Sequence, residues 1–173
     1  QPNNPYFYEL RGQALLEGGR PNDAIAPLRR AVQLSNNAPL IAMMLGQALV
    51  GANNPALADE AINILKSALA REPEAPIGYT NLAMAYGRKG DVARADLASA
   101  QGAFSRGDFM TARQLATAAE QDLADLVRVG ETRRPGDLLA RQLELVPHVD
   151  DVLLVRVQDR GRILGEGGLT EGG

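Results

Sequence analysis

One phrase recurs along the N-terminal part of this chain at the spacing of a helical repeat. Ala24, Ala61 and Ala95 lie 37 and 34 residues apart, and a turn rich in glycine or asparagine precedes each of the helices that hold them. A period of about 34 residues is typical of helix–turn–helix units, none of which can bury its apolar face alone. Because stacked units bury a continuous core, the period predicts an all-α array, an α-solenoid.

The first unit shows why these residues recur. We expect a helix over residues 6–17, with Gly12 in its middle, where glycine costs about 1 kcal/mol relative to alanine. Such a cost is tolerable where a second helix must approach closely. Gly18-Gly19 then predicts the end of this helix, through a residue in the left-handed conformation. The second helix places a buried stripe at spacings of three and four: Ala24, Leu28 and Ala31.

The pattern changes phase after Ala95. Gly107 lies 17 residues after Gly90, which is half a repeat. We therefore expect the helix over 94–105 to serve twice, closing the third unit and opening a fourth half-unit. A helix over 109–121 would end the array, giving about 3.5 repeats. The predicted domains are a repeat domain over 4–121 and a divergent C-terminal tail over 122–173.

Composition argues against several classes of function. The net charge of −3 is unlike that of a nucleic-acid binder, which carries a basic stripe. The chain has no cysteine, so it contains no disulfide and no zinc–thiolate site, and this is compatible with cytoplasm and periplasm alike. No apolar stretch approaches the roughly 20 residues of a membrane-spanning helix, and we expect no membrane span.

The tail over 122–173 is a different kind of sequence. All seven aromatic side chains lie at or before Phe109, and the net negative charge falls wholly in the tail. We expect a short helix over 137–145 and a strand over 152–157 that begins a hairpin, which needs a partner surface because a lone hairpin is marginal in water. Three interpretations stay open: a lineage-specific cap, a dimerisation arm that makes the chain a homo-oligomer, and a tail translated out of frame.

The repeats resemble the tetratricopeptide repeat (TPR) family in general. Residues 4–20, 83–91 and 106–114 resemble more narrowly the C-terminal repeat region of bacterial M48 zinc metallopeptidases. This resemblance implies a periplasmic module that follows a protease domain. Its partners would be unfolded clients, outer-membrane assembly components or that protease domain. The protease motif His-Glu-x-x-His is absent here. We therefore expect no enzyme activity and no cofactor, with zinc confined to an upstream protease domain.

The candidate site is the concave groove that the first helices line in such arrays. We expect it to bind a protein or peptide, because methionine makes adaptable apolar contacts and glutamine pairs with a peptide backbone. The alternative for each residue is ordinary helix surface or packing. The predicted groove residues are Tyr6, Glu9, Gln13, Leu40, Met43, Gln47, Ile77, Thr80, Met84, Arg88, Gln101 and Phe104.

Two other functions are less well supported by the sequence. A structural or oligomerisation module, whose tail pairs with another chain or with the protease domain, is the alternative to a binding groove. An enzyme is the weakest hypothesis, and we assign no catalytic residue. His148 near Asp150 and Asp151 lacks metal-ligand spacing, and no nucleophile-elbow motif surrounds Ser99 or Ser105.

Overall fold

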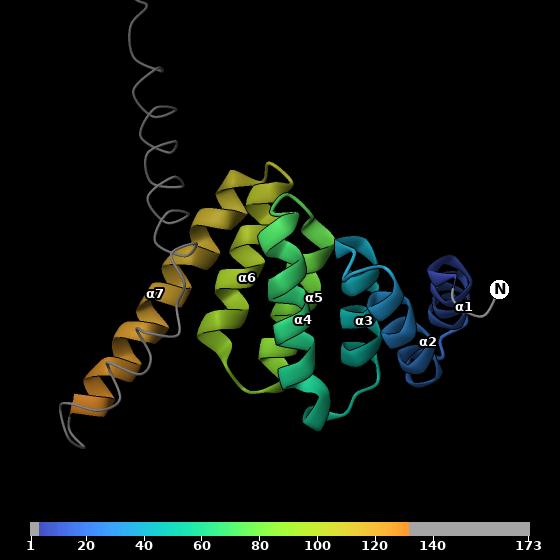
Figure 1. Cartoon of the computed structure of the whole chain (residues 1–173). Coiled ribbons are helices and arrows are strands. Elements are labelled where there is room, and N and C mark those ends of the chain that lie inside the picture. The colour runs from blue at the N-terminus through green and yellow to red at the C-terminus, as the bar shows by residue number, and fades with distance from the viewer. Residues whose placement is uncertain (1–3, 132–173) are drawn as a thin grey trace, which may run out of the picture.

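The computed structural model describes residues 4–131 of the chain, with side chains to residue 125. Within this range the chain is helical, without strands, and the helices follow one another along the array (Figure 1). This confirms the predicted all-α solenoid of three and a half helix pairs. The elements are α1 (Pro5–Glu17), α2 (Pro21–Leu34), α3 (Pro39–Gly51), the 3-10 turn η1 (Pro55–Leu57), α4 (Ala58–Arg71), α5 (Pro76–Arg88), α6 (Val92–Ser105) and α7 (Phe109–Glu131).

The first helices of the three full repeats, α1, α3 and α5, are built alike. Each is 13 residues long and begins with proline, at Pro5, Pro39 and Pro76. Proline suits the first helical position because its missing N–H has no partner within a helix there. Residues at equal distances from these prolines are therefore equivalent, with offsets of 34 and 37 along the sequence.

The turns between paired helices use a left-handed residue, as predicted at Gly18-Gly19. Gly19 has a φ of +67°, and Gly90 and Gly107 have φ of +76° and +81° at the corresponding turns. Asn53 takes this role in the second unit, with a φ of +54°. Glycine and asparagine adopt this conformation most readily, so the helix ends are fixed by local sequence.

Close approach within each pair explains the glycines in the helix interiors. A Cβ atom added to Gly46 would lie 2.5 Å from Cγ of Leu65 on α4, and Gly12 faces Leu28 of α2 in the same way. Because real Cβ atoms do not approach so closely, only glycine lets the paired helix pack at this distance. The prediction that Gly12 permits a close second helix is confirmed.

The helix α6 packs against both α5 and α7. Small residues are buried along it, among them Ala98, Gly102 and Ala103, so both neighbours can approach. This agrees with the prediction that one helix serves two units. The last helix, α7, does not end at Gln121 as expected but continues to Glu131. The division of the chain at residue 121 therefore cuts through a helix, and the domain boundary stays a prediction.

Polar contacts also join neighbouring repeats. The guanidinium of Arg29 on α2 donates two hydrogen bonds to the Glu60 carboxylate on α4, of 2.8 and 2.6 Å. Planar two-point pairing of this kind fixes the relative orientation of two elements. The other contacts of this set join Arg71 to the carbonyl of Asn37, Arg88 to the side chain of Asn53, and Lys89 to Asp59.

The predictions made for the C-terminal tail mostly fall outside the described residues. These are the helix over 137–145, the hairpin that begins with 152–157, and the three interpretations of the segment. Residues 122–131 are the exception, because they belong to α7.

Candidate protein-binding face

Six of the predicted groove residues form a regular, exposed surface on the first helices. They occupy two equivalent places on each helix, seven residues apart and hence on the same side. Direct packing of α1 on α3 and of α3 on α5 sets the three pairs beside one another. We call this surface the first-helix face: Tyr6, Gln13, Leu40, Gln47, Ile77 and Met84, all exposed.

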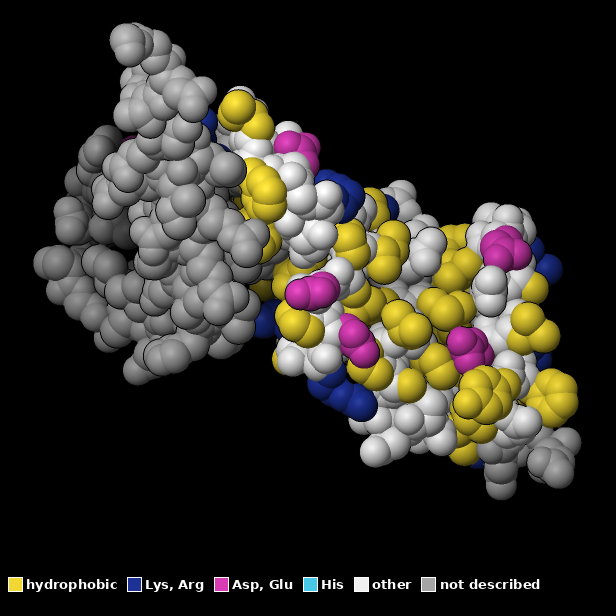
Figure 2. Space-filling model, turned by 90° about the horizontal axis from the view of Figure 1, so that it is seen from above, with side chains coloured by type: hydrophobic (Ala, Val, Ile, Leu, Met, Phe, Trp, Pro, Cys, Tyr) yellow, Lys and Arg dark blue, Asp and Glu magenta, His cyan; other side chains and the backbone are white. Residues whose placement is uncertain are grey.

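The chemistry of the first-helix face is mainly apolar, with amide groups. Tyr6, Leu40 and Ile77 each follow the proline that begins a first helix. Gln13 and Gln47 supply donors and acceptors, and Met84 takes their place on α5. Figure 2 shows hydrophobic side chains along the array, including its α1 end, with most basic side chains at the margins of that view. Exposed apolar side chains beside a few amides suit a polypeptide ligand.

The predicted polar groove residues are partly engaged within the protein. Glu17 accepts a hydrogen bond of 2.9 Å from the Gln13 amide, and the Thr80 hydroxyl donates to the carbonyl of Pro76 over 3.1 Å. Arg88 is half-buried and donates to the side chain of Asn53. Glu9 is half-buried on α1. Three of these predicted groove residues, Gln13, Thr80 and Arg88, therefore already have protein partners.

Met43 does not lie on the exposed surface, contrary to the prediction. Its side chain is only 3% exposed. A Cβ atom added to Gly78 of α5 would lie 3.2 Å from Met43 Sδ and 2.7 Å from Cδ2 of Leu69. The absence of a side chain at Gly78 brings α5 close to α3 and covers Met43, which therefore belongs to the core between repeats.

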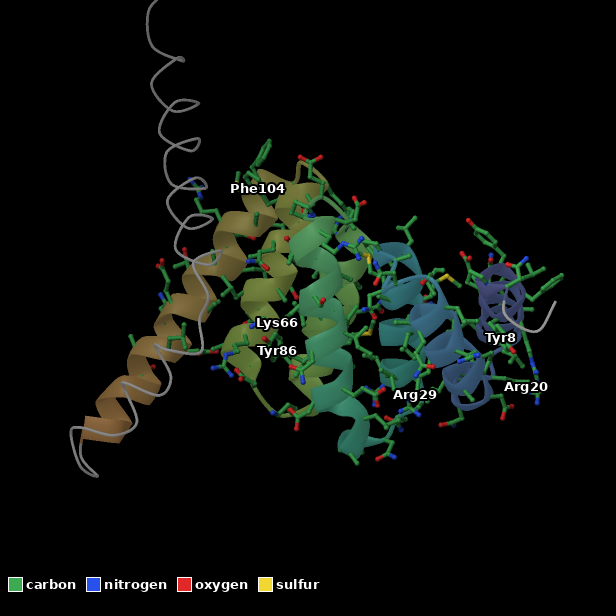
Figure 3. The ribbon with its side chains drawn as sticks, in the orientation of Figure 1. Tyr8, Arg20, Arg29, Lys66, Tyr86 and Phe104 are labelled. Carbon is green, nitrogen blue, oxygen red and sulfur yellow. The ribbon has the colours of Figure 1, made fainter. Side chains whose placement is uncertain are left out.

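Gln101 and Phe104 also differ from the prediction. Gln101 is 5% exposed, because α6 packs between two helices and leaves no free side at this residue. Phe104 is half-buried near the end of α6 (Figure 3) and packs edge-on against Phe109, with ring centroids 5.4 Å apart. The predicted row therefore stops at α5, and neither side chain extends the first-helix face.

The remaining candidates show no catalytic arrangement within residues 4–131. The hydroxyls of Ser99 and Ser105 donate to carbonyls of their own helix, those of Ala95 and Gln101, over 2.8 and 2.9 Å. His148 lies outside the described residues. In the part of the chain that was described, no group of three or more acidic, histidine or cysteine side chains could hold a metal ion. None of the described helices is long and apolar enough to cross a membrane.

The clearest electrostatic effect belongs to a contact between repeats rather than to a reactive group. Hydrogen bonding to the Glu60 carboxylate raises the pKa of Arg29 above its ordinary value, and the negative charge of Glu60 adds to this. Figure 3 places Arg29 on the side of the array where α2 approaches α4. We interpret this pair as a structural contact that stabilises the packing of the first repeat on the second.

The sequence reasoning missed two features of the first helices. The amide nitrogen of Asn81, Nδ2, is buried and has no hydrogen-bond partner within the described structure. Phe7 and Leu10 on α1 are 61% and 64% exposed. Both features stand out when the three helices are aligned from their first prolines. In this alignment the polar Asn81 takes the place of the apolar Leu10, and Phe7 takes the place of the buried Ile41.

Comparison with known proteins agrees with this architecture. The family described as tetratricopeptide repeat matches residues 1–39 and 43–100, which is more than half of the chain. No curated protein gave a match. TPR repeats generally mediate protein–protein interaction and are typically non-catalytic, so the first-helix face is where a protein partner is to be sought.

Proposed function

Because the chain belongs to the tetratricopeptide repeat family, we propose that it is a non-catalytic binding module that holds an extended polypeptide across the first-helix face. The observation that carries the proposal is the repetition of exposed apolar and amide side chains at two equivalent places on α1, α3 and α5. A ligand in extended conformation meets each helix in turn. It can place apolar side chains against Tyr6, Leu40 and Ile77, while its backbone pairs with Gln13 and Gln47.

Binding to an unfolded polypeptide tests this proposal. The probe is fluorescently labelled α-lactalbumin, kept unfolded by reduction and carboxymethylation, and the readout is fluorescence anisotropy. The double variant Met84→Glu with Gln47→Ala should lose binding at least tenfold, because it removes an apolar contact and an amide and adds a charge. Both side chains are exposed, so the melting temperature should change little. Binding that survives in this variant would refute the proposal.

A matched control lies on α7. Gln114 and Arg113 are exposed there, away from the first helices. The double variant Arg113→Ala with Gln114→Ala should bind the probe as the parent protein does. Equal loss in both double variants would mean that the probe attaches without using the first-helix face, which also contradicts the proposal.

We further propose that the module recognises clients for an M48-type metalloprotease in the periplasm, and that it needs no cofactor of its own. The support is the resemblance of residues 4–20, 83–91 and 106–114 to the repeat region of those proteases. Sequencing the gene upstream of these residues tests it. An in-frame His-Glu-x-x-His motif is the expected result, and an open frame without this motif would leave a free-standing adaptor instead.

A further inference from the structure

The outer side of α1 is uncovered at places that are buried in the other first helices. Phe7 is equivalent to Ile41 on α3 and to Gly78 on α5; it is 61% exposed, whereas Ile41 is 5% exposed and Gly78 is buried. Ala14 is likewise exposed, although the equivalent Ala48 and Ala85 are completely buried. One side of α1 therefore lacks a neighbour that its equivalents possess.

The repeats show what kind of element covers this side. On α5, the place equivalent to Phe7 is Gly78, and Leu69 of the preceding second helix, α4, lies against it. On α3 the corresponding pair is Ile41 with Val32 of α2, both in the core. In both repeats the cover is an antiparallel helix of 14 residues with an aliphatic stripe. The open side of α1 is therefore suited to the same kind of helix.

Charge distinguishes this surface from its equivalents. Arg11, the middle residue of α1, stands where α3 and α5 carry the buried Leu45 and Leu82. Its side chain is exposed and makes no hydrogen bond or ion pair with the described part of the chain. A partner that covers Phe7 and Leu10 would also cover this guanidinium, which then requires a carboxylate, because an unpaired buried charge is costly.

We propose that the outer side of α1, formed by Phe7, Leu10, Arg11 and Ala14, docks an amphipathic helix of another polypeptide that carries aliphatic residues and an acidic residue on one face. The size of the partner residue opposite Phe7 follows from the same comparison of repeats. The large Leu69 faces Gly78, and the smaller Val32, its equivalent, precedes the repeat that holds Ile41, so we expect the still larger Phe7 to require a small residue opposite it.

A second copy of this chain fits less well. Two copies of α1 that paired antiparallel about a two-fold axis would bring their central residues together. The Arg11 guanidinium of each copy would then face the other, and like charges in a desolvated interface are unfavourable. The opposite end of the array does not offer the required helix either. On α7 the residues equivalent to Ile25 and Val32 of α2 are Arg113 and Glu120, and both are exposed.

The test uses a helix of this chain as a probe. A peptide of residues 57–72 with blocked ends contains α4, and Lys66→Glu in this probe places a carboxylate near Arg11. In the probe Leu69→Ala supplies the small residue that Phe7 requires. We expect this peptide to bind the intact protein, to shift the NMR signals of α1, and to bind more tightly than the unchanged peptide. Signals that shift at α5 instead, or tighter binding of the unchanged peptide, would overturn the proposal.

Variants of the protein locate the contact. Phe7→Ala with Leu10→Ala should weaken peptide binding about tenfold or more, as truncation of central interface side chains does. The matched control is Val92→Ala with Met110→Ala, which removes two other exposed apolar side chains and should leave the affinity unchanged. Equal weakening in both variants would show non-specific adhesion and contradict the docking site.

A charge exchange tests the role of Arg11. In antiparallel helices that set Leu69 against Gly78, residue 66 comes near Leu82, the equivalent of Arg11. The probe with Lys66 restored should bind the parent protein more weakly and should recover affinity for the Arg11→Glu variant. No recovery would refute the pairing of Arg11 with a carboxylate of the partner.

Sedimentation velocity tests whether a second copy of the chain is the occupant. Self-association that Phe7→Ala abolishes would make a second copy the occupant and overturn the proposal. The first-helix-face variant Met84→Glu with Gln47→Ala should bind the peptide normally, so the two sites can fail independently.

Discussion

At one end of the array α1 leaves Phe7 and Leu10 exposed, whereas at the other end α7 presents Arg113 and Glu120. Both helices pack their inner sides in the same repetitive way. The difference lies in the outer sides, since the outer side of α7 carries charged residues and that of α1 keeps apolar residues of the kind found on an internal helix. The surface that caps a solenoid is polar. The outer side of α1 is therefore suited to receive a further helix.

The largest effect is expected from removing the difference at the C-terminal end. Arg113→Ile with Glu120→Ala would give α7 an apolar outer side, with a small residue at the place equivalent to Leu69 of α4. Such a helix complements the open side of α1, so copies should associate head to tail into assemblies that grow with concentration. Sedimentation velocity would detect this growth. Adding Phe7→Glu should restore the size of the parent protein, and assemblies that persist would show that α1 is not the contact.

A pair of equivalent substitutions compares the end with the interior directly. Ile41→Ala should lower the free energy of unfolding by about 2–4 kcal/mol, because it removes a buried side chain and leaves a cavity. Phe7→Ala, at the equivalent place on α1, should change it by no more than about 0.5 kcal/mol. Urea denaturation of both variants provides the measurement. A comparable loss in the Phe7 variant would mean that α1 is covered in solution.

The contact between the first two repeats gives a smaller effect near the open end. Glu60→Gln removes the charge partner of Arg29, and a partly exposed pair of this kind contributes about 0.2–1 kcal/mol. Amide exchange should then accelerate in α1 and α2 before α7, since these helices lose a link to the rest of the array. Uniform acceleration along the chain would instead indicate that the described helices open as one unit.

The smallest effect concerns the closed end and depends on pH. The hydrogen bonds with Thr111 hold the pKa of Asp108 below its ordinary value, and the backbone N–H of Thr111 donates to its carboxylate over 3.1 Å. The stabilisation is therefore complete above the unfolded pKa, about 3.9, and is lost as pH falls through the folded pKa. Protection of the first turn of α7 should decrease there. Asp108→Asn keeps a capping group and should reduce this acid dependence; an unchanged dependence would assign it to other carboxylates.

Local sequence determined the parts of the fold that were predicted well. The interior glycine Gly12, the turn glycine Gly19 and the stripe of Ala24, Leu28 and Ala31 each have a reason within one helix pair. The errors arose where three helices meet. Met43 is buried only because Gly78, distant in sequence, lets α5 approach. Gln101 is buried because α6 has neighbours on both sides; the half-repeat spacing predicted this sharing, but the assignment of Gln101 to the groove did not take it into account.

The uncovered side of α1 could have been predicted by aligning the repeats from their first prolines. Periodicity within α1 shows apolar residues around the helix and does not separate the inner side from the outer. Comparison of Phe7 with Ile41, and of Arg11 with Leu45, makes the distinction, because the equivalent residues are already known to face a preceding helix. The other repeats give no equivalent residues from which the identity of a partner helix could be predicted.

The contacts between repeats also bear on how the chain folds. The side chains of Arg29, Arg71, Arg88 and Lys89 meet partners 31, 34, 35 and 30 residues away in the sequence. Each link therefore closes a loop of nearly the same length, with nearly the same loss of chain entropy. Folding can begin at any repeat and spread to its neighbours, and a repeat emerging from the ribosome can pack before the next has been synthesised.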